Sequence, residues 1–428
     1  MRDLARFAVF VALVSLAQTA TASNAGDEIP EPLTLDWCIE RGRQVNPTLG
    51  RISALAVAAE HRIRPAGALE DPRIAYDASN VPTGDFDFDS TALSGHQFGL
   101  RQKLPFPGLR SSRENAARRE AEASELLHVD QRFVTSGTVE AAWAELSFAQ
   151  QALDITLRNI DLLRQLVATA ESRYRVGSGL QQDVLRAQVE LTVLLQERLQ
   201  RDEAIARAES ALVALLDLPA ETRLPRTANQ RSTSPVPALP PLLSSLEERS
   251  ARFRSAQKKV EEARMRIRVA ELESFPDVDL GIGYRVRSRV AGDPVKGDDF
   301  LSAGLTVRLP IDRSKWRAHV AERRALLRHA EAVLRGVRAT LIEEIRSAHA
   351  ELVRSSAEGA LLETGLVPQA QQSLEASRSA YKVGRIEFLS LLDSQVRLLE
   401  AELRLARARA DKRRAFAALE AAAGEELR

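Results

Sequence analysis

The chain has 428 residues, of which 44% are apolar, 28% are charged and only 5% are aromatic, a composition that argues against one large globular core. The 60 Lys and Arg residues balance the 59 Asp and Glu residues. The resulting net charge of +1 excludes a strongly basic nucleic-acid-binding protein, so no nucleic acid is expected as a partner. The single cysteine, Cys38, excludes an intrachain disulfide framework and a cysteine metal cluster.

The first 22 residues have the organisation of a secretory signal peptide. Arg2 and Arg6 precede an apolar stretch from Phe7 to Ala17, and Ala20-Thr21-Ala22 supplies a small-residue cleavage pattern. After this segment no apolar run in the sequence reaches the roughly 18 to 20 residues that a membrane-spanning helix needs. The sequence therefore predicts an exported protein without membrane-spanning helices.

The rest of the chain repeats one plan twice. Pro72 corresponds to Pro276, 204 positions later. The segment Tyr174-Arg175-Val176-Gly177 recurs as Tyr381-Lys382-Val383-Gly384 after 207 positions. Landmarks in the same order at a nearly constant offset indicate a duplicated domain. We expect a first repeat at 23–217, a proline-rich connector at 218–243 and a second repeat at 244–428.

Each repeat is expected to contain a helix, two strands, a very long helix, a tight turn and a second helix. The expected strands lie at about 72–82, 93–104, 276–287 and 300–309, and the expected long helices at about 111–174, 180–217, 313–382 and 387–424. At 1.5 Å per residue the first long helix would reach about 96 Å, which no compact domain accommodates. Gly359, Gly365 and Pro368 mark bends or a break in the corresponding helix of the second repeat.

The expected strands alternate in a way that is typical of an outer-membrane barrel. In the third strand Val278, Leu280 and Ile282 share one face, while Asp279 and Gly281 lie on the other. Four strands cannot close a barrel, because the smallest spanning barrels have about eight, and open edges would leave unpaired backbone groups in lipid. Two, three or four copies would supply the missing strands, and soluble hairpins packed on the helices remain the alternative.

The order and spacing of these features resemble the TolC family of outer-membrane efflux proteins over nearly the whole mature chain. The residues that carry the resemblance are Leu33-Thr34-Leu35-Asp36, Asn46-Pro47-Thr48-Leu49, the strand-to-helix joints Leu104-Pro105 and Leu309-Pro310, and the two Tyr-(Arg/Lys)-Val-Gly turns with Gln188 and Gln395 downstream.

The resemblance implies a mainly α fold with a β-barrel part, assembled as a homotrimer. Twelve strands would form one barrel among the lipids of the outer membrane, continuous with a twelve-helix α-barrel in the periplasm. The implied function is that of an exit duct in a tripartite efflux system. The duct would passively conduct substrates delivered by an inner-membrane pump of the RND type and a periplasmic adaptor protein.

The resemblance also implies where the working residues lie. Val176, Gly177, Val383 and Gly384 match the helical tips that dock on the adaptor, and glycine permits the tight reversal between helices at these points. The alternative is that these glycines only make turns.

The residues that match the periplasmic gate of the family are Asp183, Tyr381 and Asp393. Asp393 corresponds to one carboxylate of an aspartate ring, which would favour cations, whereas Ser390 stands at the position of the other ring aspartate and Ile386 at that of a gate arginine. The alternative is that the two aspartates are merely solvated helix residues.

The segment from Gln102 to Leu109 is similar to the heavy-metal efflux branch of the family, which implies metal cations as cargo. The six histidines lack the spacing of metal ligands, so no bound metal and no cofactor are expected. The alternatives to the duct are a periplasmic adaptor and a soluble coiled-coil scaffold. The sequence has no Gly-rich phosphate loop, zinc-protease motif or nucleophile elbow, so we do not expect an enzyme.

Overall fold

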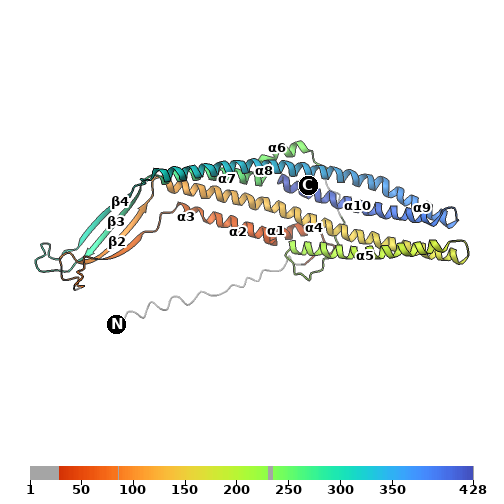
Figure 1. Cartoon of the computed structure of the whole chain (residues 1–428), viewed down its shortest axis with the longest axis horizontal. Coiled ribbons are helices and arrows are strands. Elements are labelled where there is room, and N and C mark those ends of the chain that lie inside the picture. Colours follow the sequence, from red (N-terminus) through yellow and green to blue (C-terminus); the bar gives the residue numbers. More distant parts are fainter. Residues whose placement is uncertain (1–27, 85, 230–234, 428) are drawn as a thin grey trace, which may run out of the picture.

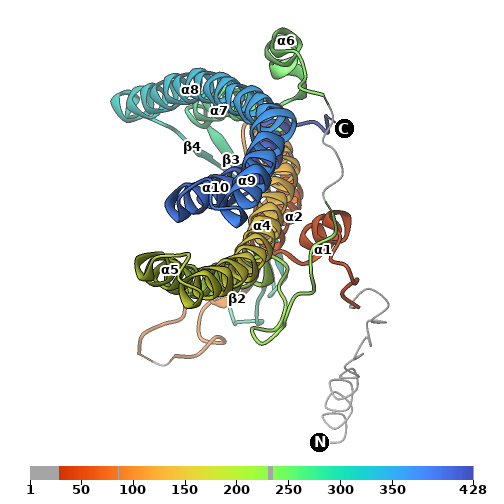
Figure 2. The same cartoon turned by 90° about the vertical axis from the view of Figure 1, so that its right-hand side faces the viewer.

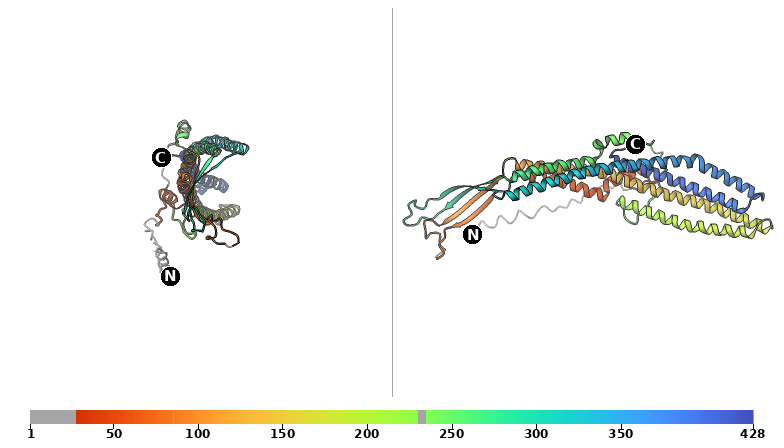
Figure 3. Two further views of the ribbon diagram at one scale, coloured as in Figure 1. Left: turned by 90° about the vertical axis from the view of Figure 1, so that its left-hand side faces the viewer. Right: turned by 45° about the horizontal axis from the view of Figure 1, so that its top comes forward.

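The computed structural model describes residues 28–84, 86–229 and 235–427, so the expected signal peptide at 1–22 lies outside the described residues. The molecule is elongated, with a sheet at one end and helical hairpin turns at the other (Figure 1; Figure 3). In the first repeat the helices are α1 (Leu35–Val45), α2 (Pro47–His61), α3 (Ile63–Gly67), α4 (Leu109–Arg175) and α5 (Gln181–Leu215), and the strands are β1 (Arg73–Ser79) and β2 (Gly95–Leu104).

The second repeat follows the same plan, with two helices in place of three before its strands and with an interrupted long helix. Its elements are α6 (Leu239–Arg249), α7 (Ala251–Glu273), β3 (Asp277–Val286), β4 (Phe300–Arg308), α8 (Arg313–Leu361), the π-helical segment η1 (Leu362–Leu366), α9 (Val367–Lys382) and α10 (Phe388–Ala423). The 67-residue α4 is uninterrupted, whereas its counterpart consists of α8, η1 and α9.

The interruption in the second repeat comes from Pro368. A proline has no backbone N–H, and its ring clashes with the carbonyl group four residues earlier in a regular α-helix. Immediately before it, the N–H of Val367 donates to the carbonyl oxygen of Leu362, which lies five residues back and widens one turn. The expected break is thus a π-helical segment, through which the helix continues.

The four strands form one antiparallel sheet in the order β1-β2-β3-β4. The register places apolar side chains level with one another across the sheet: Ile74, Leu100, Ile282 and Ala303 form one such row, and Tyr76, Phe98, Tyr284 and Leu301 form the next. Because alternate residues of a strand face opposite sides, these rows make one apolar face. That face is open to solvent in the single chain; for example, Ile74 is 84% exposed.

The long helices form one curved layer around α4, with α1 and α6 outside its curve (Figure 2). Near the sheet, α4 contacts α2 and α7, and α7 contacts α8. Towards the hairpin turns, α4 contacts α5 and α10, and α10 contacts α8 and α9. The core is therefore a set of interhelical seams and has no single centre.

The outer segment α1 is held against the layer by a buried contact. Trp143 of α4 is 2% exposed, and its indole Nε1–H donates to the carbonyl oxygen of Leu33 at 3.2 Å. The connector closes over the same side, because Arg226 forms two hydrogen bonds of 2.7 and 2.6 Å with the carboxylate of Asp154.

Among the described residues, no helix has both the length and the apolar character needed to cross a membrane.

Candidate functional site

The two helical hairpins end in turns of the same geometry. We call residues 174–179 the first tip and residues 381–386 the second tip. Gly177 has φ +71° and Gly384 has φ +72°, a left-handed conformation that glycine adopts without steric cost. In the first tip Ser178 N–H donates to Arg173 O at 2.9 Å, and in the second Arg385 N–H donates to Ala380 O at the same distance.

Each tip glycine also donates its N–H at 3.0 Å, to Tyr174 O in the first tip and Tyr381 O in the second. This pair of bonds is the Schellman motif, which satisfies the last carbonyl groups of a helix. The preceding valines, Val176 and Val383, are 75% and 68% exposed. The structure therefore presents both tips as hydrogen-bonded turns with an apolar side chain at the surface.

Arg173 joins the two tips, and sequence reasoning missed it. Its Nη1 donates to the carbonyl oxygen of Tyr381, and its Nη2 donates to the carbonyl oxygen of Ser178 at 3.2 Å. The guanidinium also lies over the ring of Tyr381, with Cζ 4.8 Å from the centroid, in a cation–π contact. Arg173 thus binds the end of α4 to the end of α9.

Tyr381 is almost completely buried, at 3% exposure, and packs edge-on against Phe388. Its hydroxyl has no hydrogen-bond partner among the described residues, so in the single chain it makes no bond to Asp183. Burial raises the pKa of the Tyr381 hydroxyl, and the negative charge of nearby Asp183 raises it further. Asp183 itself lies half-buried in the first turn of α5.

Asp393 lies on the exposed face of α10, close to the second tip, and it forms an ion pair. Its Oδ2 is 2.8 Å from Nε of Arg397, one helical turn further on. The side chains are 58% and 71% exposed, respectively. Arg397, which the sequence reasoning did not consider, therefore places a positive charge beside each expected ring carboxylate.

Ser390 lies on the same helix and contributes no charge. Its carbonyl oxygen accepts a hydrogen bond at 2.9 Å from the hydroxyl of Ser394, which also bonds Ser377 of α9 at 2.9 Å. The polar contacts of the seam between α9 and α10 beside Asp393 are thus made by neutral hydroxyl groups.

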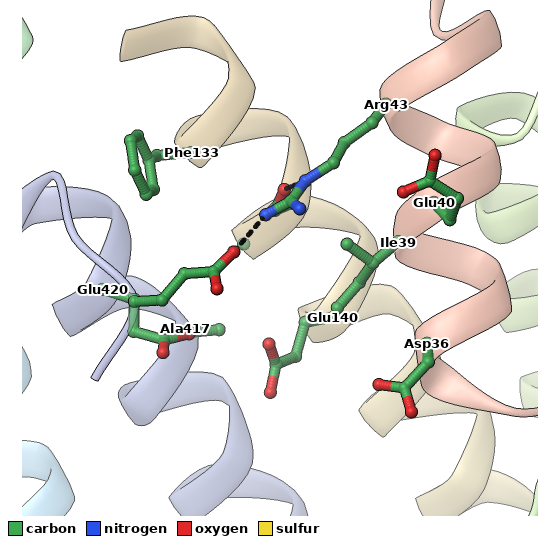
Figure 4. A pocket seen from close by; sticks show the side chains of 11 residues that line it. Asp36, Ile39, Glu40, Arg43, Phe133, Glu140, Ala417 and Glu420 are labelled. Atoms are coloured by element: carbon green, nitrogen blue, oxygen red, sulfur yellow. Dashed lines mark hydrogen bonds and ion pairs between the residues drawn. The ribbon is translucent and has the colours of Figure 1, made fainter. Parts of the chain in front are cut away.

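A cavity of about 230 Å³ lies beneath α1, at mid-length of the molecule, between α4 and α10 (Figure 4). Arg43 of α1 crosses it, with Nε 2.8 Å from Ser136 Oγ and Nη2 2.9 Å from Glu426 Oε1. These bonds attach α1 to the layer on the side opposite the hollow of its curve. No group of three or more potential metal ligands occurs within the described ranges.

Comparison with known proteins identifies the family. The model of the family "Outer membrane efflux protein" matches residues 39–217 and 242–425, so the chain belongs to this family. Its fold and family are those of channel proteins, and it is an outer-membrane efflux channel whose helices extend into the periplasm.

Individual relatives agree with this assignment. The chain is 23% identical over 397 residues to the cobalt-zinc-cadmium resistance protein CzcC of Cupriavidus metallidurans, covering 91% of this chain and 90% of that protein. The solved outer-membrane channel OprN superposes with a TM-score of 0.77 at 20% identity, over 92% of this chain and 90% of its own. The outer membrane protein VceC of Vibrio cholerae gives a TM-score of 0.76 at 20% identity, over 92% and 97%. These two structures establish the fold.

Proposed function

We propose that three copies of this chain close into one conduit, with a twelve-stranded barrel in the outer membrane and a twelve-helix tunnel in the periplasm. The observation that carries the proposal is the sheet with two free edges. β1 pairs only with β2 and β4 only with β3 among the described strands, while the apolar face is exposed. In lipid, such edges require partner strands, and copies of this chain supply them.

The helical layer also has a free edge, at α5. On α5, residues that face α4 are buried, such as Ala187 and Leu194, while Leu185, Val189 and Leu199 point to the opposite side and are 54%, 63% and 68% exposed. A row of exposed apolar side chains on one helix face indicates a packing partner. We assign this partner to the helical layer of the neighbouring copy. The closure that pairs the strands of two copies also brings the edges of their helical layers together.

The first experiment is purification from outer membranes in mild detergent, followed by light scattering. We expect a mass three times that of the mature chain and an oligomer in gel electrophoresis that heating dissociates. A water-soluble monomer that needs no detergent would contradict the proposal and would favour a scaffold instead.

We further propose that the two tips dock on a periplasmic adaptor and that an inner-membrane pump of the RND type supplies the energy. Support comes from the exposed Val176 and Val383 at the free end of the molecule. Photo-crosslinkers placed at these two positions in native cells should capture the adaptor, whereas a crosslinker at Leu305 in the sheet should not. Capture at Leu305 and none at the tips would contradict this docking surface.

For the cargo, we propose heavy-metal cations, supported by the likeness to CzcC, a cobalt-zinc-cadmium resistance protein. A strain that lacks this channel should accumulate cobalt, zinc or cadmium and recover when the chain is supplied. Unchanged metal levels together with increased retention of organic dyes would assign the channel to organic compounds.

A further inference from the structure

A row of charged side chains runs along one face of α10. Its members recur every three or four residues, the spacing that aligns side chains on a helix. We call this set the charged row: Asp393, Arg397, Glu400, Arg404, Arg407, Asp411 and Arg414.

The charged row faces the hollow side of the curved layer. On α4, Trp143 points to α1 on the outside, and Glu145, two residues later, is rotated by about 200° from it. Glu145 accepts from Arg407 of the charged row at 2.8 Å. Conversely Arg413, on the other side of α10, pairs at 3.2 Å with Glu140, which lines the cavity beneath α1 (Figure 4). In Figure 2, α1 lies outside the curve.

Each arginine of the charged row is paired with a carboxylate. Arg404 lies 3.6 Å from Glu358 of α8, and Arg407 reaches Asp411 at 3.0 Å as well as Glu145. Arg414 contacts Asp411 at 2.6 Å. The hollow face is thus a ladder of ion pairs across α4, α8 and α10.

At the tip end, the last pair is Asp393 with Arg397. We infer that the charged row lines the conduit and that Arg397 is a specificity-determining residue, because it cancels the charge of Asp393 and so lowers the preference of the tip end for cations. This inference rests on the proposed trimer. Asp393 and Arg397 lie one turn apart on α10, within a Debye length of about 8 Å, so Arg397 screens the charge of Asp393 even when the exposed pair is transiently open.

The physical consequence concerns what the conduit admits. Three unpaired carboxylates around an axis would attract cations and repel anions, as charged rings do in cation channels. Each Asp393–Arg397 pair carries no net charge of its own, so three such pairs attract cations less than three unpaired carboxylates would.

The test is the reversal potential of single channels in planar bilayers under a potassium chloride gradient. Relative to the wild type, we expect the cation-to-anion permeability ratio to rise severalfold for Arg397→Gln, to fall severalfold for Asp393→Asn, and to return towards the wild-type value for the double variant. The matched control is Arg226→Gln, which removes an equally paired arginine on the outer side of the layer and should leave the ratio unchanged.

A second readout tests whether the charged row lines the conduit. In Arg404→Cys channels, a cationic thiol reagent should change the conductance, and the background is low because Cys38 is buried and burial raises its pKa to about 12. Conducting channels in which Arg397→Gln leaves the ratio unchanged, or in which Arg404→Cys does not respond, would overturn the inference. A complete absence of channels would instead overturn the proposed function on which it rests.

Discussion

At the scale of single residues, the contact that matters most joins side chains distant in the sequence. The motif Tyr-x-Val-Gly was enough to predict the two turns, because a left-handed residue after a helix is nearly always glycine. It could not predict Arg173, whose guanidinium meets Tyr381 at a sequence separation of 208 residues. Nor does a local pattern show that the Tyr381 hydroxyl is buried without a partner.

The two tip glycines should respond differently to substitution. Alanine costs about 1–2 kcal/mol in the left-handed conformation at either site. At Gly384, however, an added Cβ would lie 3.2 Å from Nη2 of Arg173, whereas at Gly177 it would meet nothing within 4 Å. We expect Gly384→Ala to loosen both tips and Gly177→Ala only the first, as measured by amide hydrogen exchange. Equal loosening of the second tip by both variants would contradict a bridging role for Arg173.

Tyr381→Phe should remove an alkaline sensitivity of the second tip. Burial raises the pKa of the Tyr381 hydroxyl in the folded tip above its ordinary value of about 10. As the pH rises, the hydroxyl therefore ionises at a lower pH in the opened tip than in the folded tip. The stability from this group is therefore present below about pH 10 and is lost above it. Loss of the unpartnered hydroxyl should also stabilise the tip by about 1 kcal/mol.

The measurement for this variant is an ultraviolet titration of tyrosinate absorbance. The difference between wild type and Tyr381→Phe isolates the one hydroxyl, which should ionise later than a free tyrosine. Ionisation at the ordinary pKa would show that the ring is accessible to water.

At the scale of elements, the free edge of α5 decides assembly. Val189→Glu places a carboxylate in the middle of the exposed apolar row, where a neighbouring copy would bury it without a partner, at a cost of several kcal/mol. We expect loss of the trimer in detergent, measured by light scattering. The control Glu190→Gln changes the charge one residue further along, about 100° round the helix from Val189, and should retain the trimer. A trimer that survives Val189→Glu would place the subunit interface elsewhere.

At the scale of the whole molecule, the two faces of the sheet have different surroundings in the proposed barrel. Leu305 and Gly304 are neighbours on β4 that point to opposite faces. Lysine at Leu305 would face lipid and cost about 2–4 kcal/mol per chain near mid-membrane, whereas the polar interior accepts it at Gly304, where an added Cβ meets nothing within 4 Å.

We therefore expect Leu305→Lys to reduce the amount of this protein in the outer membrane and Gly304→Lys to leave that amount unchanged, as measured by membrane fractionation and immunoblotting. Equal amounts of the two variants in the membrane would contradict a lipid-facing role for the Leu305 side.

The sequence by itself determined the parts that depend on local order. Alternation of apolar residues with glycine and polar residues specified β3 and β4, proline and glycine placed the interruption near Pro368, and the repeat at about 205 positions predicted two equivalent halves. Each of these signals arises from a residue and its neighbours along the chain, where backbone geometry directly limits the choice of residue.

Only the tertiary structure decided which side chains meet. Asp393 and Arg397 are one turn apart, yet their role emerges only when Glu145 and Trp143 show which side of the layer is hollow. Contacts such as Arg173 with Tyr381 depend on how long helices are rotated and shifted against one another. Those rotations are set by packing of whole seams, a sum of many weak interactions that no short stretch of sequence contains.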